Sequence, residues 1–199
     1  MPSALDSADR FEVTSRAAWR AWLAANHEQP DGIWLVTFKK HTGERYVDYD
    51  SVVEEALCFG WIDSLPRKLD ADRTMLYLSP RRPKSIWSRL NKTRVDALEN
   101  AGLMTDVGRA KIEAAKADGS WTVYDSVEDL IVPDDLRDAL AEESTAATQF
   151  EAFSASSKKG VLWWIKSARR KATRVSRIAK TVRLAKLGVV ANTPDARGH

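Results

Sequence analysis

The change from strand-type to helix-type hydrophobic spacing near Pro83 limits the fold more than any other feature of this sequence. Before that proline, four short stretches are rich in β-branched and aromatic residues, as strands are: 10–13, 33–40, 61–68 and 74–79. After it, apolar residues recur every three or four positions, which is helical spacing. The sequence therefore predicts a small sheet that is complete before Pro83 and a helical remainder.

Helices are also predicted between and directly after the strands, because polar capping residues precede the apolar-periodic stretches. The predicted caps or starts are Thr14 or Ser15, Asp50 or Ser51, Ser85, and Thr105. The order β-α-β-α-β-β followed by helices predicts an α+β fold. It consists of a small mixed β-sheet with flanking helices, followed by an all-helical basic C-terminal module.

Composition and spacing predict four parts of the chain. They are an α+β domain at 1–122, a linker at 123–133, a helical C-terminal module at 134–190 and a flexible tail at 191–199. The irregular aromatic stretch SWTVYDSVEDLIVP indicates the linker. The helices expected in the module are 134–142, 145–153, 157–168 and 171–187.

Charge is distributed unevenly along the chain, although the net charge is only +3. Residues 1–150 hold 19 Lys and Arg against 26 Asp and Glu, whereas residues 151–199 hold 12 against 2. On the last predicted helix, an apolar arc (Ala172, Val175, Ile178, Ala179, Val182, Ala185) lies opposite a cationic arc. The cationic arc, a candidate site for an anionic partner, consists of Arg174, Arg177, Lys180 and Arg183. Nucleic acid, anionic lipid and an acidic protein remain open as partners, and so does a purely solvated or internally packed face.

Several classes of protein and site are not supported by the sequence. No run of about 18 apolar residues predicts a transmembrane helix, and the N-terminal residues lack the pattern of a secretory signal. A single cysteine, Cys58, permits no internal disulfide and is expected to be buried, so we expect a cytoplasmic protein. The three histidines are scattered, and no nucleophile elbow, phosphate loop or dinucleotide motif occurs. We therefore predict no metal, no cofactor and no catalytic residues.

Asp63 lies in the apolar stretch CFGWIDS and needs a hydrogen-bonding or ionic partner if it is buried. Arg81 and Arg82 follow the next predicted strand, so either could form a bidentate pair with the carboxylate. We accordingly predict an Asp63–guanidinium pair.

The segment that carries these arginines is rich in donors and begins a predicted helix, an arrangement that suits a phosphate or carboxylate. The hypothetical site for an anionic or sugar-like ligand consists of Asp63, Arg81, Arg82, Ser85, Trp87, Ser88 and Asn91. The alternative is that Ser85 merely caps the helix and the arginines stabilise the fold. Lys39, Lys40 and Tyr49 form a lesser candidate set, of interest only if the fold brings it beside Asp63.

Four stretches resemble the YdeI/OmpD-associated family of bacterial proteins, whose members are called bacteriocin-protection proteins. They are EEALCFGWIDS (54–64), SPRRPKSIWSRLNKTRV (79–95), GLMTDVGRAKIEAAKADGSW (102–121) and WWIKSARRKATRVSRIAKTVRLAKLG (163–188). This chain has Lys171-Ala172 where members often have a proline and an acid. The connection between the last two predicted helices is therefore expected to be smoother and more basic here. The resemblance implies a role in resisting antimicrobial peptides or envelope stress, and no reaction.

Three functions remain open from the sequence. The first is a cytoplasmic binding protein that contributes to bacteriocin or envelope-stress tolerance. The second is a small-molecule binding protein or enzyme that uses Asp63 and the 81–91 segment. The third is nucleic-acid binding through the basic C-terminal helices. The sequence predicts neither the ligand nor the oligomeric state.

Overall fold

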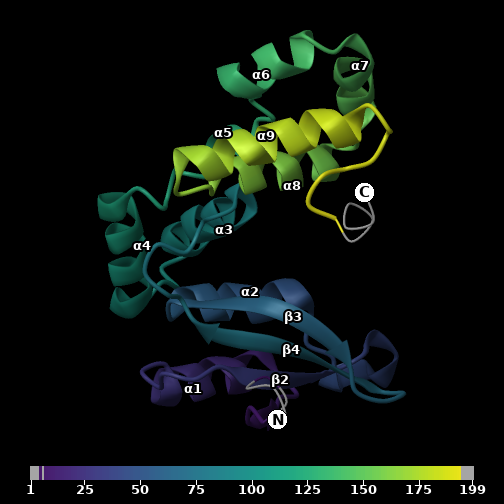
Figure 1. The fold of residues 1–199 in the computed structure, drawn as a ribbon. Coiled ribbons are helices and arrows are strands. Elements are labelled where there is room, and N and C mark those ends of the chain that lie inside the picture. The colour runs from purple at the N-terminus through teal and green to yellow at the C-terminus, as the bar shows by residue number, and fades with distance from the viewer. Residues whose placement is uncertain (1–4, 6, 194–199) are drawn as a thin grey trace. The chain divides into compact units, whose positions relative to one another are not determined.

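A computed structural model describes residues 5 and 7–193 of the 199-residue chain. The chain forms two compact units, Met1–Val123 and Tyr124–His199, each with its own hydrophobic core. The first unit contains the β-sheet and the second is helical (Figure 1). The predicted α+β class, with a mixed sheet followed by helices, is confirmed.

The sheet of the first unit has four strands in the order β1-β2-β4-β3. β1 pairs with β2 in parallel, and the other two pairings are antiparallel, so the sheet is mixed. A β-bulge interrupts the β3–β4 pairing between Asp63 and Pro66, where strict side-chain alternation therefore breaks down. The strands are β1 (Arg10–Glu12), β2 (Ile33–Phe38), β3 (Trp61–Lys68) and β4 (Arg73–Pro80).

Alternating residues of β2 enter two different apolar clusters, because successive side chains point to opposite faces of a strand. Ile33 and Leu35 belong to the main core, which also contains residues of the helices α1 and α2. Trp34 and Val36 belong to a smaller cluster that includes Leu5. The helices of this unit are α1 (Arg16–Asn26), the 3-10 helix η1 (Lys40–Arg45), α2 (Tyr49–Cys58), α3 (Arg89–Asn100) and α4 (Asp106–Asp118).

Two helix starts differ from the prediction. The cap of α2 is Asp48, whose side chain accepts the Ser51 N–H at 2.8 Å. The cap of α3 is Ser88, so the segment around Ser85 is an irregular turn and no helix begins there. Asp48 lies just before the predicted cap of α2, and Ser88 lies within one turn after the predicted cap of α3. Hydrophobic spacing in the sequence does not show which of several neighbouring polar residues caps a helix.

The second unit packs its helices around Leu136, Phe150 and Ile165, all fully buried. The four predicted helices are present, and a short helix lies within the stretch predicted as a linker. The helices are α5 (Asp125–Glu128), α6 (Asp134–Ala141), α7 (Ser144–Ala152), α8 (Ala155–Lys166) and α9 (Lys171–Ala185). The predicted flexible tail lies outside the described residues from position 194 onward.

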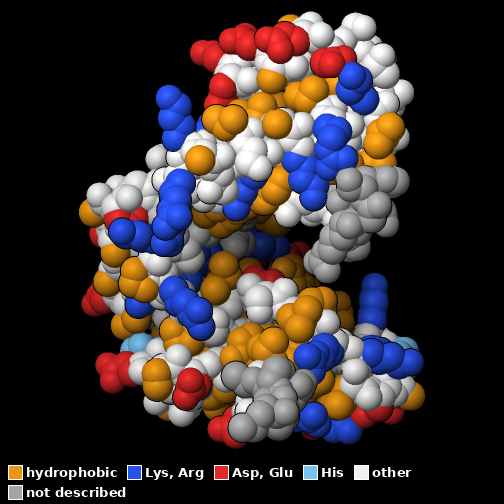
Figure 2. Space-filling view, viewed as in Figure 1, with side chains coloured by type: hydrophobic (Ala, Val, Ile, Leu, Met, Phe, Trp, Pro, Cys, Tyr) orange, Lys and Arg blue, Asp and Glu red, His pale blue; other side chains and the backbone are white. Residues whose placement is uncertain are grey.

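The buried face of α9 differs from the predicted apolar arc. The helix buries Ile178, Thr181, Leu184 and Ala185, while Val175 is 57% exposed. Helical spacing allowed several overlapping arcs, and packing selects the one that contains Leu184. Val175, Ala179 and Val182 of the predicted arc line a groove beside α6, where Figure 2 shows hydrophobic atoms between the acidic side chains of α6 and the basic ones of α9.

Candidate anion-binding site

The end of strand β4 carries Arg81 into the interior of the first unit. The Arg81 N–H donates to the Gly60 carbonyl at 2.9 Å, which continues the β3–β4 pairing by one step. Gly60 has φ +72°, and a Cβ there would lie 2.6 Å from Cγ of Lys111, so a side chain at this position would be strained and crowded. Arg81 itself is only 3% exposed.

The Arg81 guanidinium is incompletely paired. Its carbon lies 3.5 Å from the centroid of the Trp87 ring, and its Nη1 donates to the Ile86 carbonyl at 3.2 Å and to Ser85 Oγ at 3.5 Å. Its Nε and Nη2 atoms are buried and have no hydrogen-bond partner. A buried unpaired donor costs about 1–3 kcal/mol, and more when it is charged. The side chain therefore holds two unpaired donor nitrogens that are closed off from solvent.

Burial also changes the acidity of this group. Desolvation lowers the pKa of Arg81 to about 10, although the nearby Asp63 carboxylate acts in the opposite direction. A cation that loses this much hydration would be stabilised by an anion in direct contact with it.

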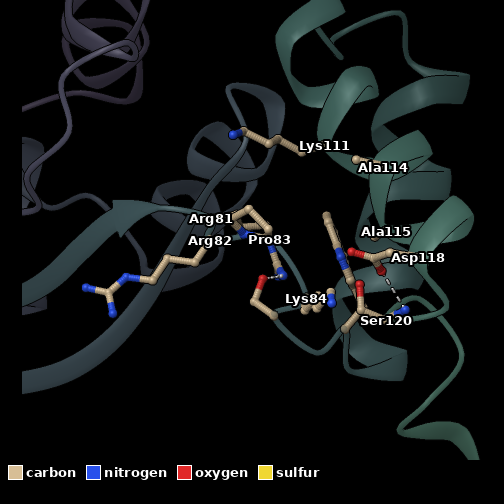
Figure 3. Close-up of a pocket in the computed structure, with 11 residues that line it drawn as sticks. Arg81, Arg82, Pro83, Lys84, Lys111, Ala114, Ala115, Asp118 and Ser120 are labelled. Carbon is tan, nitrogen blue, oxygen red and sulfur yellow. Dashed lines mark hydrogen bonds between the residues drawn. The ribbon is translucent and has the colours of Figure 1, made fainter.

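A cavity of about 90 Å³ lies beside the guanidinium (Figure 3). Water occupies about 30 Å³ per molecule in the liquid, so this space suits about three waters or one small oxyanion. It is lined by Arg81, Arg82, Pro83, Lys84, Ser85, Trp87, Lys111, Ala114, Ala115, Asp118 and Ser120. All of these residues come from the turn after β4 and from α4 and its C-terminal end.

The charged residues that line this cavity are mostly cationic, whereas much of its wall is apolar. Lys84 and Lys111 are exposed side chains at its rim, whereas Arg82 extends away from it in Figure 3. Asp118 is the one carboxylate among the lining residues, and the Ser120 hydroxyl and N–H group lower its pKa. The Ser120 hydroxyl lies beside this carboxylate and is buried without a hydrogen bond of good geometry.

The turn that forms one wall has an unusual backbone. Lys84 adopts φ +63°, which is uncommon for a residue with a side chain. Such conformations persist where the surrounding structure imposes them, and they are enriched at functional sites.

The predicted Asp63–guanidinium pair is wrong. Asp63 Oδ2 instead accepts a hydrogen bond from the Tyr49 hydroxyl at 2.7 Å, and no ion pair joins it to Arg81 or Arg82 in the described part of the chain. The reason is local geometry: the guanidinium stacks on Trp87, and α2 places a phenol beside the carboxylate. Asp63 still acts on Arg81 electrostatically at longer range.

Ser88 and Asn91 do not line the Arg81 cavity. Ser88 caps α3 by accepting the Asn91 N–H at 3.3 Å. The buried Asn91 accepts a hydrogen bond from Arg94 at 3.0 Å, and Arg94 also pairs with Asp50. Of the predicted ligand set, the structure brings Arg81, Arg82, Ser85 and Trp87 together at one cavity and distributes the other three elsewhere.

Sequence reasoning missed Lys111, Asp118 and Ser120, which α4 and its end bring to the cavity. They follow Arg81 by some thirty to forty positions, and no motif connects them to it. It also missed Glu55, a carboxylate only 2% exposed that pairs with Arg16 and Arg20 at 2.6 Å each. A charged residue on the apolar side of the helix VVEEALC was the available signal.

Two arginines of the cationic arc of α9 make hydrogen bonds within their own unit. Arg174 makes two hydrogen bonds to the Asp135 carboxylate, at 2.7 and 2.8 Å. Arg177 donates to the Trp164 carbonyl and to Ser167 Oγ. The use of Arg174, Arg177, Lys180 and Arg183 for an anionic partner stays a prediction.

The predicted burial of Cys58 is confirmed: the thiol is free, and burial raises its pKa. Among residues 5 and 7–193, no group of His, Cys, Asp and Glu side chains is arranged to hold a metal ion. In the same part of the chain, no helix has both the length and the apolar character needed to cross a membrane.

The fold and the cavity together define a two-unit protein with an α+β unit that contains a candidate anion site, followed by a helical unit. Residues 11–111 match a family model described as "Domain of unknown function (DUF8412)", and the chain belongs to this family. Residues 129–188 match the model described as "Bacteriocin-protection, YdeI or OmpD-Associated", so the chain also carries this domain. Comparison with curated proteins and with solved structures finds no match.

Sequence stretches that resemble the YdeI/OmpD-associated family lie in the ranges of two different family models. The YdeI/OmpD-associated domain contains the stretch 163–188, whereas 54–64 and 79–95 lie within the range of the other family. The candidate anion site therefore belongs to the unit whose family has no named function, except that Lys111 is the last residue of the matched range and Asp118 and Ser120 lie beyond it.

Proposed function

We propose that this protein is a cytoplasmic binding protein whose ligand presents a small oxyanion, such as a phosphate or carboxylate group, to Arg81. The observation that carries the proposal is the buried guanidinium, with two unpaired donor nitrogens, of a residue that lines a cavity of about 90 Å³. Lys84 and Lys111 supply further charge and donors. A guanidinium is well suited to such a ligand because its donors match the geometry of a planar or tetrahedral oxyanion.

The matched domain name gives this binding activity a biological setting. Residues 129–188 belong to a family named for bacteriocin protection, and we propose that ligand binding in the first unit contributes to bacteriocin or envelope-stress tolerance. A deletion strain complemented with Arg81→Met tests this link. Bacteriocin sensitivity like that of the empty strain supports it, and full protection by the variant contradicts it.

Thermal unfolding in phosphate, sulfate and acetate, at constant ionic strength with chloride as reference, tests the anion site directly. At a concentration of 100 times Kd, a ligand that binds only the folded state adds about 2.7 kcal/mol of stability. For a chain of this size, that corresponds to a rise in Tm of about 5–10 °C.

Arg81→Met is the informative variant because it removes the charge while keeping an extended side chain. Without anion it should unfold at the same temperature as the wild type or higher, since a buried unpaired charge is lost. With anion it should lose the specific rise in Tm. Arg10→Met, at an exposed arginine of β1, is the matched control and should respond as the wild type does. An equal anion response in Arg81→Met would contradict the proposal.

A further inference from the structure

A second cavity of the first unit is larger than the Arg81 cavity and separate from it. It is a cleft of about 620 Å³, a volume within the usual range for small-molecule sites. Its lining is mainly apolar and comes from β2, η1, α2, β3 and β4. The residues are Thr37, Phe38, Lys39, Lys40, Tyr46, Val47, Tyr49, Val52, Asp63, Ser64, Pro66, Thr74, Met75 and Leu76. The fold thus brings Lys39, Lys40 and Tyr49 into one cleft with Asp63, although only Tyr49 is in contact with that carboxylate.

The strand register places opposite charges at the two ends of this cleft. Asp63 pairs with Leu78 of β4, whereas the Lys39 N–H donates to the Asp72 carbonyl just before that strand. Six positions along an extended strand span about 20 Å at 3.3 Å per residue. The carboxylate therefore lies at one end and Lys39 and Lys40 at the other, with Val47, Val52 and Leu76 among the apolar lining residues.

The Asp63 end of the cleft offers mainly hydrogen-bond acceptors, and the Ser64 hydroxyl there donates to the Tyr77 carbonyl at 3.4 Å. The Tyr49 hydroxyl proton is committed to Asp63, which leaves lone pairs on both groups. Burial and the Asp63 carboxylate raise the pKa of Tyr49 to about 12, so the phenol stays protonated at neutral pH. Arg94, the cation nearest the Tyr49 ring at 5.8 Å, is paired with Asp50. A ligand group at this end must therefore donate, and the carboxylate favours a cationic donor.

The opposite end favours an acceptor. Lys39 Nζ donates to the carbonyls of Asp70 and Ala71 at 2.7 and 2.8 Å, which holds its charge at the rim of the cleft. Lys40 is exposed and makes no ion pair with any residue that the structure describes. These two ammonium groups suit a carboxylate.

We infer that this cleft binds a short apolar peptide with free termini, its ammonium group at Asp63 and its carboxylate at Lys40. Charge complementarity gives the direction of the peptide, and the apolar lining contacts its side chains. A tetrapeptide spans about 13 Å of the roughly 20 Å between the two ends of the cleft. The long, flexible lysine side chains can extend toward its carboxylate over the rest of that distance. This cleft shares no lining residue with the Arg81 cavity, so peptide binding here can be tested separately from anion binding at Arg81.

Isothermal titration calorimetry with a tetrapeptide of alternating leucine and alanine tests the inference. Wild-type protein should bind the form with free termini at least tenfold more tightly than the N-acetylated form or the C-amidated form. Absence of binding by the free form, or equal binding of all three forms, would overturn the inference.

Two variants assign each terminus to its residue. Asp63→Asn keeps an oxygen that accepts from Tyr49, so the variant should fold, yet N-acetylation should no longer weaken binding to it. In Lys40→Met, C-amidation should no longer weaken binding. Asp96→Asn and Lys68→Met, at exposed positions outside the cleft, should keep both effects. If Asp63→Asn still discriminates against the acetylated peptide as the wild type does, the assignment of the ammonium end is wrong.

Discussion

At Arg81, a charge is buried without a counter-ion in contact, and its energetic effect depends on pH. The folded-state pKa is about 10, below the ordinary value of 12.5. Between these values the unfolded chain binds more protons than the folded chain, so the free energy of unfolding rises with pH. Below about pH 10 the charged side chain lowers stability by a constant amount.

The difference in unfolding free energy between wild type and Arg81→Met isolates this effect from other titrating groups. In anion-free buffer, wild type should gain stability relative to the variant as the pH rises above about 10. Urea denaturation from pH 8 to pH 11 measures this difference. A difference that stays constant throughout would show that the guanidinium is hydrated or paired in solution.

The Tyr49 phenol provides a second test at the scale of single residues. Burial, followed by the hydrogen bond to Asp63, raises its pKa to about 12. In Asp63→Asn the pKa should fall toward its ordinary value, because the negative neighbour is gone while the burial remains. Ultraviolet titration, with Tyr49→Phe as the reference spectrum, measures this shift. An unchanged pKa in Asp63→Asn would mean that burial alone is responsible.

At the scale of elements, the end of α2 and the first turn of α4 lie close together at Gly108. A Cβ at this position would lie 2.3 Å from the Cys58 carbonyl oxygen and 2.8 Å from Cε of Met104. The same carbonyl accepts the Thr105 hydroxyl, which ties the start of α4 to the end of α2. The sequence pattern of α4 gives no indication of this contact, because glycine in a helix ordinarily just lowers stability.

Two glycine-to-alanine substitutions separate crowding from helix propensity. Gly108→Ala should lower the free energy of unfolding by about 1–3 kcal/mol, because the backbone contact with Cys58 must open. Gly160→Ala, in α8, has no atom within 4 Å of the added Cβ and should raise stability by about 0.5–1 kcal/mol. Chemical denaturation of both variants checks the opposite signs. Equal effects would contradict the close approach of the two helices.

At the scale of the whole molecule, each of the two units has its own main core among the described residues. One is built around Trp19, Trp61 and Trp87, and the other around Leu136 and Phe150. Each unit buries several large side chains of its own, which is a general property of domains that fold alone.

The first unit should therefore be sufficient for anion binding. A fragment of residues 1–123 should unfold cooperatively and show the same rise in Tm with phosphate as the full chain, because every lining residue of the Arg81 cavity lies within it. Differential scanning fluorimetry of the fragment and the full chain makes the comparison. A folded fragment without the phosphate response would show that the second unit is required for the site.

Local patterns in the sequence determined the elements of this protein and their order. Strand spacing in 33–40 and 61–68, and helical spacing after Pro83, depend on neighbours a few positions apart and are visible without a structure. The grouping of Arg81, Arg82, Ser85 and Trp87 was partly predictable because these residues share one short segment, but Ser88 and Asn91 of the same segment lie elsewhere.

Only the tertiary structure decided the partners of the charged residues. Tyr49 rather than an arginine binds Asp63, and residues of α4 complete the cavity of Arg81, because helix packing joins positions that are far apart in sequence. Hydrophobic spacing is a property of one element, whereas a hydrogen bond between elements depends on the relative placement of both. For that reason the sequence alone determined which segments form, and the packing of those segments decided which donors remain unpaired.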